Sequence, residues 1–227
     1  MTDAAPRWRW LLAAWHHPSA VLLGAQLLGV VLYPFFGESP TGRALVSLFG
    51  LFVLVLAVWT TRSTPALTWV AMLLGLPVVI LTVLEAMNPG QQGIVLWSSV
   101  LHGAFYLYTT YGLIRYMFAD RVVTTDELFA TGATFTVVAW AFAYLYGAIQ
   151  VIWPGSFVAA LSSSEPRSWM ELLFLSFTNL TSTGLSDVAP VLPHARALVM
   201  IEQVAGLMYI ALVVARLVGL TLARARE

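Results

Sequence analysis

The residues best suited to contact a polar solute stand in one short run, LTSTGLSD, at positions 180–187. The run combines hydroxyl side chains, one glycine and one carboxylate, and it lies between two apolar stretches of the chain. Residues of these types hydrogen-bond to water or coordinate ions, whereas the apolar stretches around them can only pack. The candidate site therefore comprises Thr181, Ser182, Thr183, Gly184, Leu185, Ser186 and Asp187.

The other chemically active residues form no catalytic pattern. The four histidines and eleven acidic residues are scattered, with neither a nucleophile–base spacing nor a metal-ligand spacing. There is no cysteine, which excludes disulfides and thiolate metal sites. The formal net charge is zero, which argues against a nucleic-acid partner. We therefore expect no enzyme activity and no cofactor.

Composition predicts the elements that position the run. The chain is 59% hydrophobic and only 10% charged, which is typical of an integral membrane protein. A helix needs about 20 apolar residues to cross a bilayer, because no water is there to pair its backbone groups. Windows of this size predict an all-α fold with six transmembrane helices, at 19–36, 42–61, 65–87, 94–118, 127–153 and 195–223.

The placement of arginine predicts the orientation of these helices. With the N-terminus inside the cell, seven arginines fall on the cytoplasmic side, and three fall outside: Arg43, Arg167 and Arg196. This bias predicts a multi-pass protein of the plasma membrane with both termini cytoplasmic. Membrane lipid would contact the outer surfaces of these helices.

The segment between the last two predicted helices is not a simple loop. Residues 168–180 are apolar but too short to cross, and Ser168 followed by Glu171 is a capping-box pattern that predicts a helix start. A short capped helix followed by a polar turn indicates a re-entrant segment. Non-helical backbone at that depth must be buried by protein or line water, so the sequence predicts that the turn lines a pore.

These residues resemble the pore domain of the potassium-channel superfamily. The likeness covers a pore helix, the run Thr181–Asp187, the following Pro190 and Gly206 on the last helix. It implies a homotetramer in which Thr181–Asp187 is the selectivity filter, with monovalent cations, K⁺ or Na⁺, held at Ser182, Thr183, Gly184 and Leu185. It also divides the chain into an N-terminal cytoplasmic or interfacial segment (1–18), a peripheral four-helix bundle (19–120) and a pore domain (121–227).

The filter departs from the family pattern at three positions. Ser186 stands where a second glycine is expected, Leu185 replaces an aromatic residue, and Thr183 replaces valine. A serine in the left-handed conformation costs about 1–2 kcal/mol, so we expect the outer ion sites to be altered and the inner sites to persist. Selectivity for potassium and weak selectivity among monovalent cations both remain open.

Three further residues have two interpretations each. Asp187 is either a carboxylate that braces the filter or a loop acid. Gly206 is either a hinge of the inner helix or a small residue that permits close packing. Glu202 either pairs near the outer vestibule, with Arg196 or with the filter backbone, which we favour, or contacts the ion.

The leading hypothesis is a passive cation channel. No helix carries arginine at every third position, so the first four helices are expected to lack a voltage sensor. The alternative is a channel-shaped accessory or signalling membrane protein that does not conduct. A transporter would require repeated halves or clustered intramembrane polar residues, and the sequence has neither.

Overall fold

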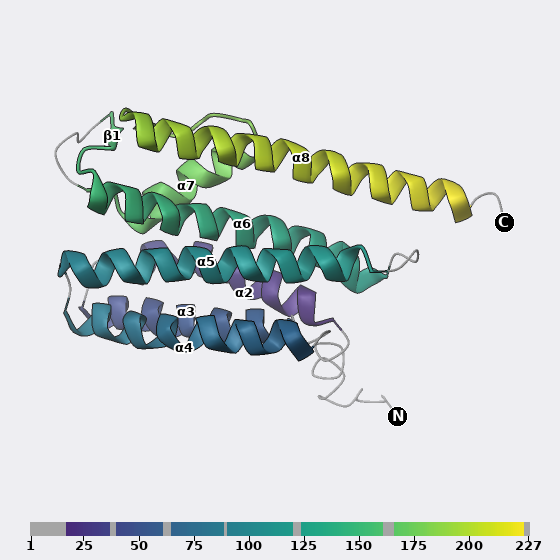
Figure 1. The fold of residues 1–227 in the computed structure, drawn as a ribbon, viewed down its shortest axis with the longest axis horizontal. Helices are drawn as coiled ribbons and strands as arrows, with labels where there is room; N and C mark the ends of the chain where they lie inside the picture. Colours follow the sequence, from purple (N-terminus) through teal and green to yellow (C-terminus); the bar gives the residue numbers. More distant parts are fainter. Residues whose placement is uncertain are drawn as a thin grey trace, which may run out of the picture.

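The computed structural model describes residues 17–36, 40–60, 65–88, 90–119, 124–160 and 166–224. The predicted N-terminal segment, residues 1–18, lies almost entirely outside these ranges. The long helices run back and forth along one axis, with α8 on one side of the molecule and α3 and α4 on the other (Figure 1). The elements are α2 (Pro18–Phe36), α3 (Pro40–Thr60), α4 (Pro65–Met87), α5 (Gln92–Met117), α6 (Thr125–Ile152), β1 (Phe157–Ala159), α7 (Trp169–Leu180), β2 (Val188–Pro190) and α8 (Pro193–Arg224).

Each predicted transmembrane segment corresponds to one long helix, and the ends agree within a few residues. Four helices in the described part of the chain are long and apolar enough to cross a membrane by length and composition: Pro18–Phe36, Trp69–Met87, Thr125–Ile152 and Pro193–Gly219. In α3 the apolar stretch among described residues is shorter, Phe49–Thr60. The fold is thus an assembly of apolar helices, as an integral membrane protein requires.

The helix α5 contains more polar residues than the helices it packs against. Many of these polar side chains are buried against those helices, which allows α5 to carry them. His102 and Thr109 are both buried, and the His102 ring stacks on Tyr144 of α6 with centroids 4.3 Å apart. Gly103 leaves room for Leu145, whose Cδ2 lies 2.7 Å from the place where a Cβ would be. These contacts pack α5 closely against α6, so side chains that would be costly in lipid face protein instead.

One face of α8 packs against the rest of the chain. Its buried residues, Ala195, Val199, Glu202, Gly206 and Val213, follow a heptad-like spacing. The remaining surface of α8 is apolar and exposed in the protomer. Its most exposed side chains include Met200, Ile201, Val204, Leu207 and Met208.

A two-stranded antiparallel ribbon, absent from the sequence-based prediction, lies beside the start of α8. Phe157 pairs with Pro190, and Ala159 pairs with Val188. Strands of three residues carry too little periodicity to be recognised in a sequence. The ribbon joins the segment after α6 to the segment after the filter run.

Candidate ion-conduction site

The helix α7 begins at the predicted capping box. Ser168 Oγ accepts a hydrogen bond from the Glu171 amide at 3.3 Å, and Glu171 Oε2 accepts one from the Ser168 amide at 2.7 Å. Arg167 lies 3.3 Å from Glu171 Oε1. Partial burial alone would raise the pKa of Glu171, but the hydrogen bonds from Ser168 and the charge of Arg167 outweigh it and lower that pKa below its ordinary value.

A second contact fixes the start of α7 to α6. The Gln150 side chain donates to the carbonyl of Arg167 and accepts from its amide, both at 2.9 Å. The amide side chain thereby pairs with the backbone as a strand neighbour would. This contact and the capping box set the direction in which α7 leaves the ribbon.

The filter run leaves α7 through a tight turn. The amides of Thr183 and Gly184 both donate to the carbonyl of Thr178, at 3.0 and 3.1 Å, and the Ser182 amide donates to Asn179 O at 3.0 Å. The Thr181 hydroxyl donates to Phe177 O at 2.7 Å. The last turn of α7 therefore anchors the run through backbone amides and through the hydroxyls of Thr181 and Thr183.

The backbone conformation of the run departs from the family pattern at Ser186. Left-handed φ angles occur at Ser182 (58°) and Gly184 (65°), whereas Ser186 is not among the residues with positive φ. Ser186 instead uses its hydroxyl to accept a hydrogen bond from the Val188 amide at 3.1 Å. The strain expected of serine is thus found at the inner end, and the outer end relaxes into a side-chain-capped turn.

The carbonyl groups of residues 182–186 accept no hydrogen bond from the described part of the chain. The side chains there are largely exposed in the protomer, and Leu185 is 77% exposed. Asp187 is also exposed, and within the described residues its carboxylate forms neither a hydrogen bond nor an ion pair. The run therefore presents a set of unsatisfied oxygen atoms along an open face.

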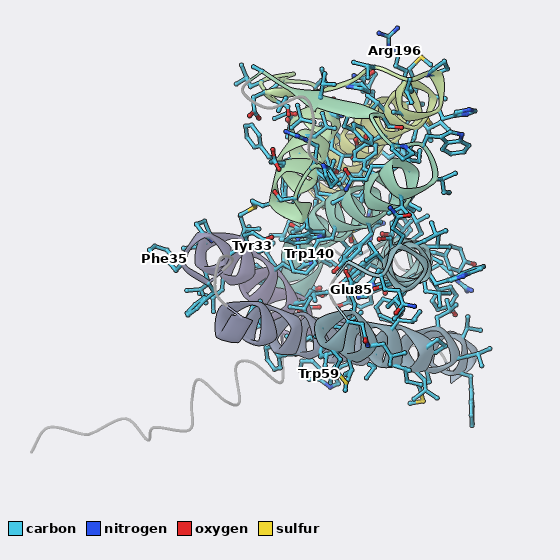
Figure 2. All side chains as sticks on the ribbon, turned by 90° about the vertical axis from the view of Figure 1, so that its left-hand side faces the viewer. Tyr33, Phe35, Trp59, Glu85, Trp140 and Arg196 are labelled. Carbon is cyan, nitrogen blue, oxygen red and sulfur yellow. The ribbon has the colours of Figure 1, made fainter. Side chains whose placement is uncertain are left out.

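The structure corrects the predicted pairing of Glu202 with Arg196. Glu202 is 0% exposed and accepts hydrogen bonds from Tyr146 Oη, Ser176 Oγ and Asn179 Nδ2, the last at 3.3 Å. Arg196 Nε donates to the carbonyl of Pro190 at 3.2 Å. Its side chain points away from the bundle at the edge of the molecule (Figure 2).

Sequence reasoning missed Tyr146, Ser176 and Asn179. The available signal was the three-residue spacing of Ser176 and Asn179 on a short, mostly apolar helix, because this spacing places both on one face. A buried carboxylate needs such donors, since an unpaired charge in the interior is strongly unfavourable.

Gly206 is a close-packing residue in this conformation. A Cβ at Gly206 would lie 2.4 Å from the carbonyl oxygen of Leu180 and 2.8 Å from its Cα. The helix α8 continues without a break through this position. Of the two interpretations, the structure therefore favours close packing of α8 against the end of α7.

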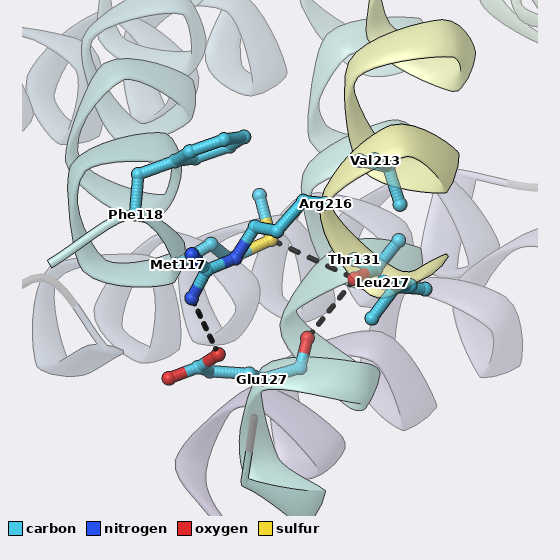
Figure 3. A pocket seen from close by; sticks show the side chains of 7 residues that line it. All are labelled: Met117, Phe118, Glu127, Thr131, Val213, Arg216 and Leu217. Carbon is cyan, nitrogen blue, oxygen red and sulfur yellow. Dashed lines mark hydrogen bonds and ion pairs between the residues drawn. The ribbon is translucent and has the colours of Figure 1, made fainter. Parts of the chain in front are cut away.

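At the other end of α8 an ion pair joins it to α6. Arg216 lies 3.1 Å from Glu127 and sits over the Phe118 ring, 5.0 Å from its centroid. The hydroxyl of Thr131 donates to the Glu127 carbonyl at 3.0 Å. Figure 3 shows this small cleft, which Met117, Val213 and Leu217 also line.

A family model described as ion channel matches residues 104–222, more than half of the chain. The match begins within α5 and includes α6, α7, the filter run and nearly all of α8. The chain belongs to this ion channel family. It is a pore-loop member of the potassium-channel superfamily, and hence a membrane protein. No curated protein and no solved structure matches the chain.

Proposed function

We propose that this ion channel is a homotetramer that passes monovalent cations through the filter run Thr181–Asp187. The observation that carries the proposal is the exposed backbone of residues 182–186, whose carbonyls accept no hydrogen bond from described residues. Carbonyls and hydroxyls in such a run can replace the hydration shell of an ion. The left-handed φ angles at Ser182 and Gly184 support an alternation that turns successive carbonyls to one side.

A single run per chain supports a four-fold assembly. One protomer encloses no pathway, whereas four equivalent runs around an axis would surround one. The exposed apolar surface of α8 would then be divided between lipid and neighbouring protomers. Because α7 ends at the run, its C-terminal partial negative charge would face the pathway and favour cations.

For this pore we propose six membrane crossings, with α3 and α5 crossing in addition to the four helices that are long and apolar enough by length and composition. The ion pair between Glu127 and Arg216 and the hydrogen bond from Ser19 to Asp126, 2.8 Å long, support the alternation of direction. They bring the starts of α2 and α6 to the same end as the last turns of α8. Both termini would then be cytoplasmic in a plasma-membrane protein, with α7 re-entering from outside.

Selectivity is expected to be incomplete. The left-handed φ angles stop before Ser186, so the inner part of the run would keep oxygen sites that the outer part lacks. The permeant ions would be K⁺ and Na⁺, with K⁺ favoured to the extent that the inner sites remain ordered. No bound cofactor is required.

Ion flux into liposomes containing the purified full chain tests this function. Parallel assays with potassium, sodium and chloride gradients should show flux of K⁺, with or without Na⁺, and no flux of Cl⁻. Crosslinking in the same liposomes should give a tetramer. Chloride flux, or absence of cation flux from folded tetramers under varied voltage and pH, would favour the second candidate, a channel-shaped protein that does not conduct.

A further inference from the structure

The buried carboxylate of Glu202 acts on the short helix that carries the filter run. Two of its three donors, Ser176 and Asn179, stand on one face of the last turns of α7, and the third, Tyr146, stands on α6. All three groups can donate, so they suit an acceptor with two oxygen atoms. Glu202 thereby connects three helices through one side chain.

The residue between those two donors holds the filter run itself. The carbonyl of Thr178 accepts both the Thr183 amide and the Gly184 amide. A shift of the last turn of α7 would move this carbonyl and release the two amides. The hydrogen bonds of Glu202 therefore help to fix the backbone of the run through Thr178, although Glu202 does not contact the run itself.

A second contact from the same face of α8 limits the same movement. Gly206 lies four residues after Glu202, and its Cα faces the backbone of Leu180 with no room for a side chain. Glu202 thus holds the last turn of α7 by hydrogen bonds while Gly206 meets it by direct packing. The two contacts fix the turn in position and in rotation.

We propose that Glu202 is a positioning residue for ion permeation, which keeps the filter amides of Thr183 and Gly184 bound to Thr178. The inference rests on the proposed function, because it assigns Glu202 a role in the proposed filter. It also predicts which substitutions are tolerated. Glutamine can accept from Tyr146 and Asn179 through its carbonyl and donate to the hydroxyl of Ser176. Leucine offers none of the three an acceptor and leaves only the 3.5 Å hydrogen bond from Asn179 Nδ2 to Tyr146 Oη among them.

Amide hydrogen exchange of the full chain in lipid nanodiscs tests the proposal without requiring conduction. In Glu202→Leu, exchange at Thr183 and Gly184 should accelerate about tenfold or more, while amides in the middle of α6 keep their protection. Glu202→Gln should stay within about twofold of the parent. The matched control is Glu85→Leu, the same change in α4, which packs on α3 and α5.

Two milder variants keep the test decisive if Glu202→Leu does not fold. Ser176→Ala and Tyr146→Phe each remove one donor with little change in volume, and each should accelerate exchange at the two filter amides. Parent-like exchange in folded Glu202→Leu, or in both milder variants, would overturn the proposal. So would acceleration in Glu202→Gln as large as in Glu202→Leu, because charge rather than hydrogen bonding would then be responsible.

Flux measurements on the same samples separate this inference from the proposed function. If the parent conducts, Ser176→Ala should change the K⁺/Na⁺ permeability ratio several-fold, and Glu202→Gln should restore parent behaviour relative to Glu202→Leu. If the parent protein passes no cation, the proposed function is wrong. In that case faster exchange at Thr183 and Gly184 would still establish that Glu202 positions the run.

Discussion

At the scale of single residues, the filter run is held to α7 by backbone hydrogen bonds, to which the hydroxyls of Thr181 and Thr183 add their own. Ser182 adopts a left-handed φ that costs a non-glycine residue about 1–2 kcal/mol. The amides of Thr183 and Gly184, both bound to Thr178, hold the neighbouring backbone in the conformation that requires this φ. The Thr183 hydroxyl adds a hydrogen bond to Thr178 O at 3.4 Å, whereas the exposed Leu185 side chain can depart from the family pattern without loss of this anchor.

The first prediction concerns the outer end of the run. The double substitution Leu185→Tyr with Ser186→Gly should raise the K⁺/Na⁺ permeability ratio roughly tenfold, equivalent to about 1.4 kcal/mol. Glycine makes a left-handed φ accessible at position 186, and tyrosine supplies a hydroxyl that can bond to the surrounding helices. Permeability ratios follow from reversal potentials in planar bilayers under mixed K⁺ and Na⁺.

Ser186→Ala is the matched control for that experiment. Alanine removes the hydroxyl that accepts from Val188 but keeps the steric limits of an L-residue, so it should not raise the ratio. An unchanged ratio in the folded double variant would contradict our account of the outer filter.

Sequence analysis predicted hydrogen-bond partners correctly where the two residues are close in the chain. It failed where the partners are distant in the chain. Ser168 and Glu171 are three residues apart, so their mutual capping follows from local helix geometry. Glu202 finds its donors on two other helices, 23 to 56 residues away, and the spacing of Ser176 and Asn179 indicates a shared face without indicating its partner. Arg196 was the nearest candidate along the chain and was wrong for that reason.

At the scale of elements, α8 combines a buried face with a close approach to α7. Glu202 and Gly206 meet the last turn of α7, and farther along the same face Tyr209 donates to the carbonyl of Thr131 in α6 at 2.6 Å. The hydrogen-bonding and small residues are spaced three or four apart, which keeps them on one side of the helix. The inner helix is thus held along its length by specific contacts rather than by apolar packing alone.

The second prediction tests the closest of these contacts. Gly206→Ala should lower the free energy of unfolding by about 1–3 kcal/mol and alter ion flux, because the new methyl group meets backbone atoms of Leu180 that no rotamer change can move. Thermal unfolding in detergent and liposome flux are the measurements. Gly219→Ala is the control, since no atom lies within 4 Å of a Cβ there, and it should be neutral or slightly stabilising.

A parent-like unfolding midpoint and flux in Gly206→Ala would show that α8 can move away from α7 at little cost. The interpretation of Gly206 as a hinge would then regain support over close packing.

At the scale of the whole molecule, the first turn of α6 links the peripheral helices to the inner helix. Asp126 accepts from Ser19 of α2 and from Tyr116 of α5, at 2.8 and 2.9 Å. The next residue, Glu127, pairs with Arg216 of α8. Two adjacent carboxylates therefore join α2 and α5 to α8 at one point.

The third prediction addresses this junction. Arg216→Glu should destabilise the fold by about 3 kcal/mol, because it places two carboxylates together where both side chains of the pair are mostly buried, 14% and 6% exposed. The reversed pair, Glu127→Arg with Arg216→Glu, should recover part of this loss. Thermal unfolding and basal flux of the two variants are to be compared with the parent. Equal destabilisation in the single and double variants would show that the pair stabilises the fold through the packing of its side chains and not through their opposite charges.

The helices of the molecule were predictable because each must supply its own backbone hydrogen bonds and an apolar stretch of sufficient length. Their mutual arrangement was not, because it depends on individual fits such as that of Gly103 against Leu145. The polar character of α5 shows this limit: the same residues that lower its hydropathy are those that face the other helices.

The β1–β2 ribbon has a mechanical consequence. It pairs Ala159 with Val188, so the chain between them forms an excursion whose two ends are pinned side by side. A force that draws the end of α6 and the start of α8 apart would load the paired backbone of the ribbon and also the contacts of Glu202 and Gly206 with the end of α7. The ends of this excursion are therefore joined by backbone hydrogen bonds in addition to the packing of α7 against α8.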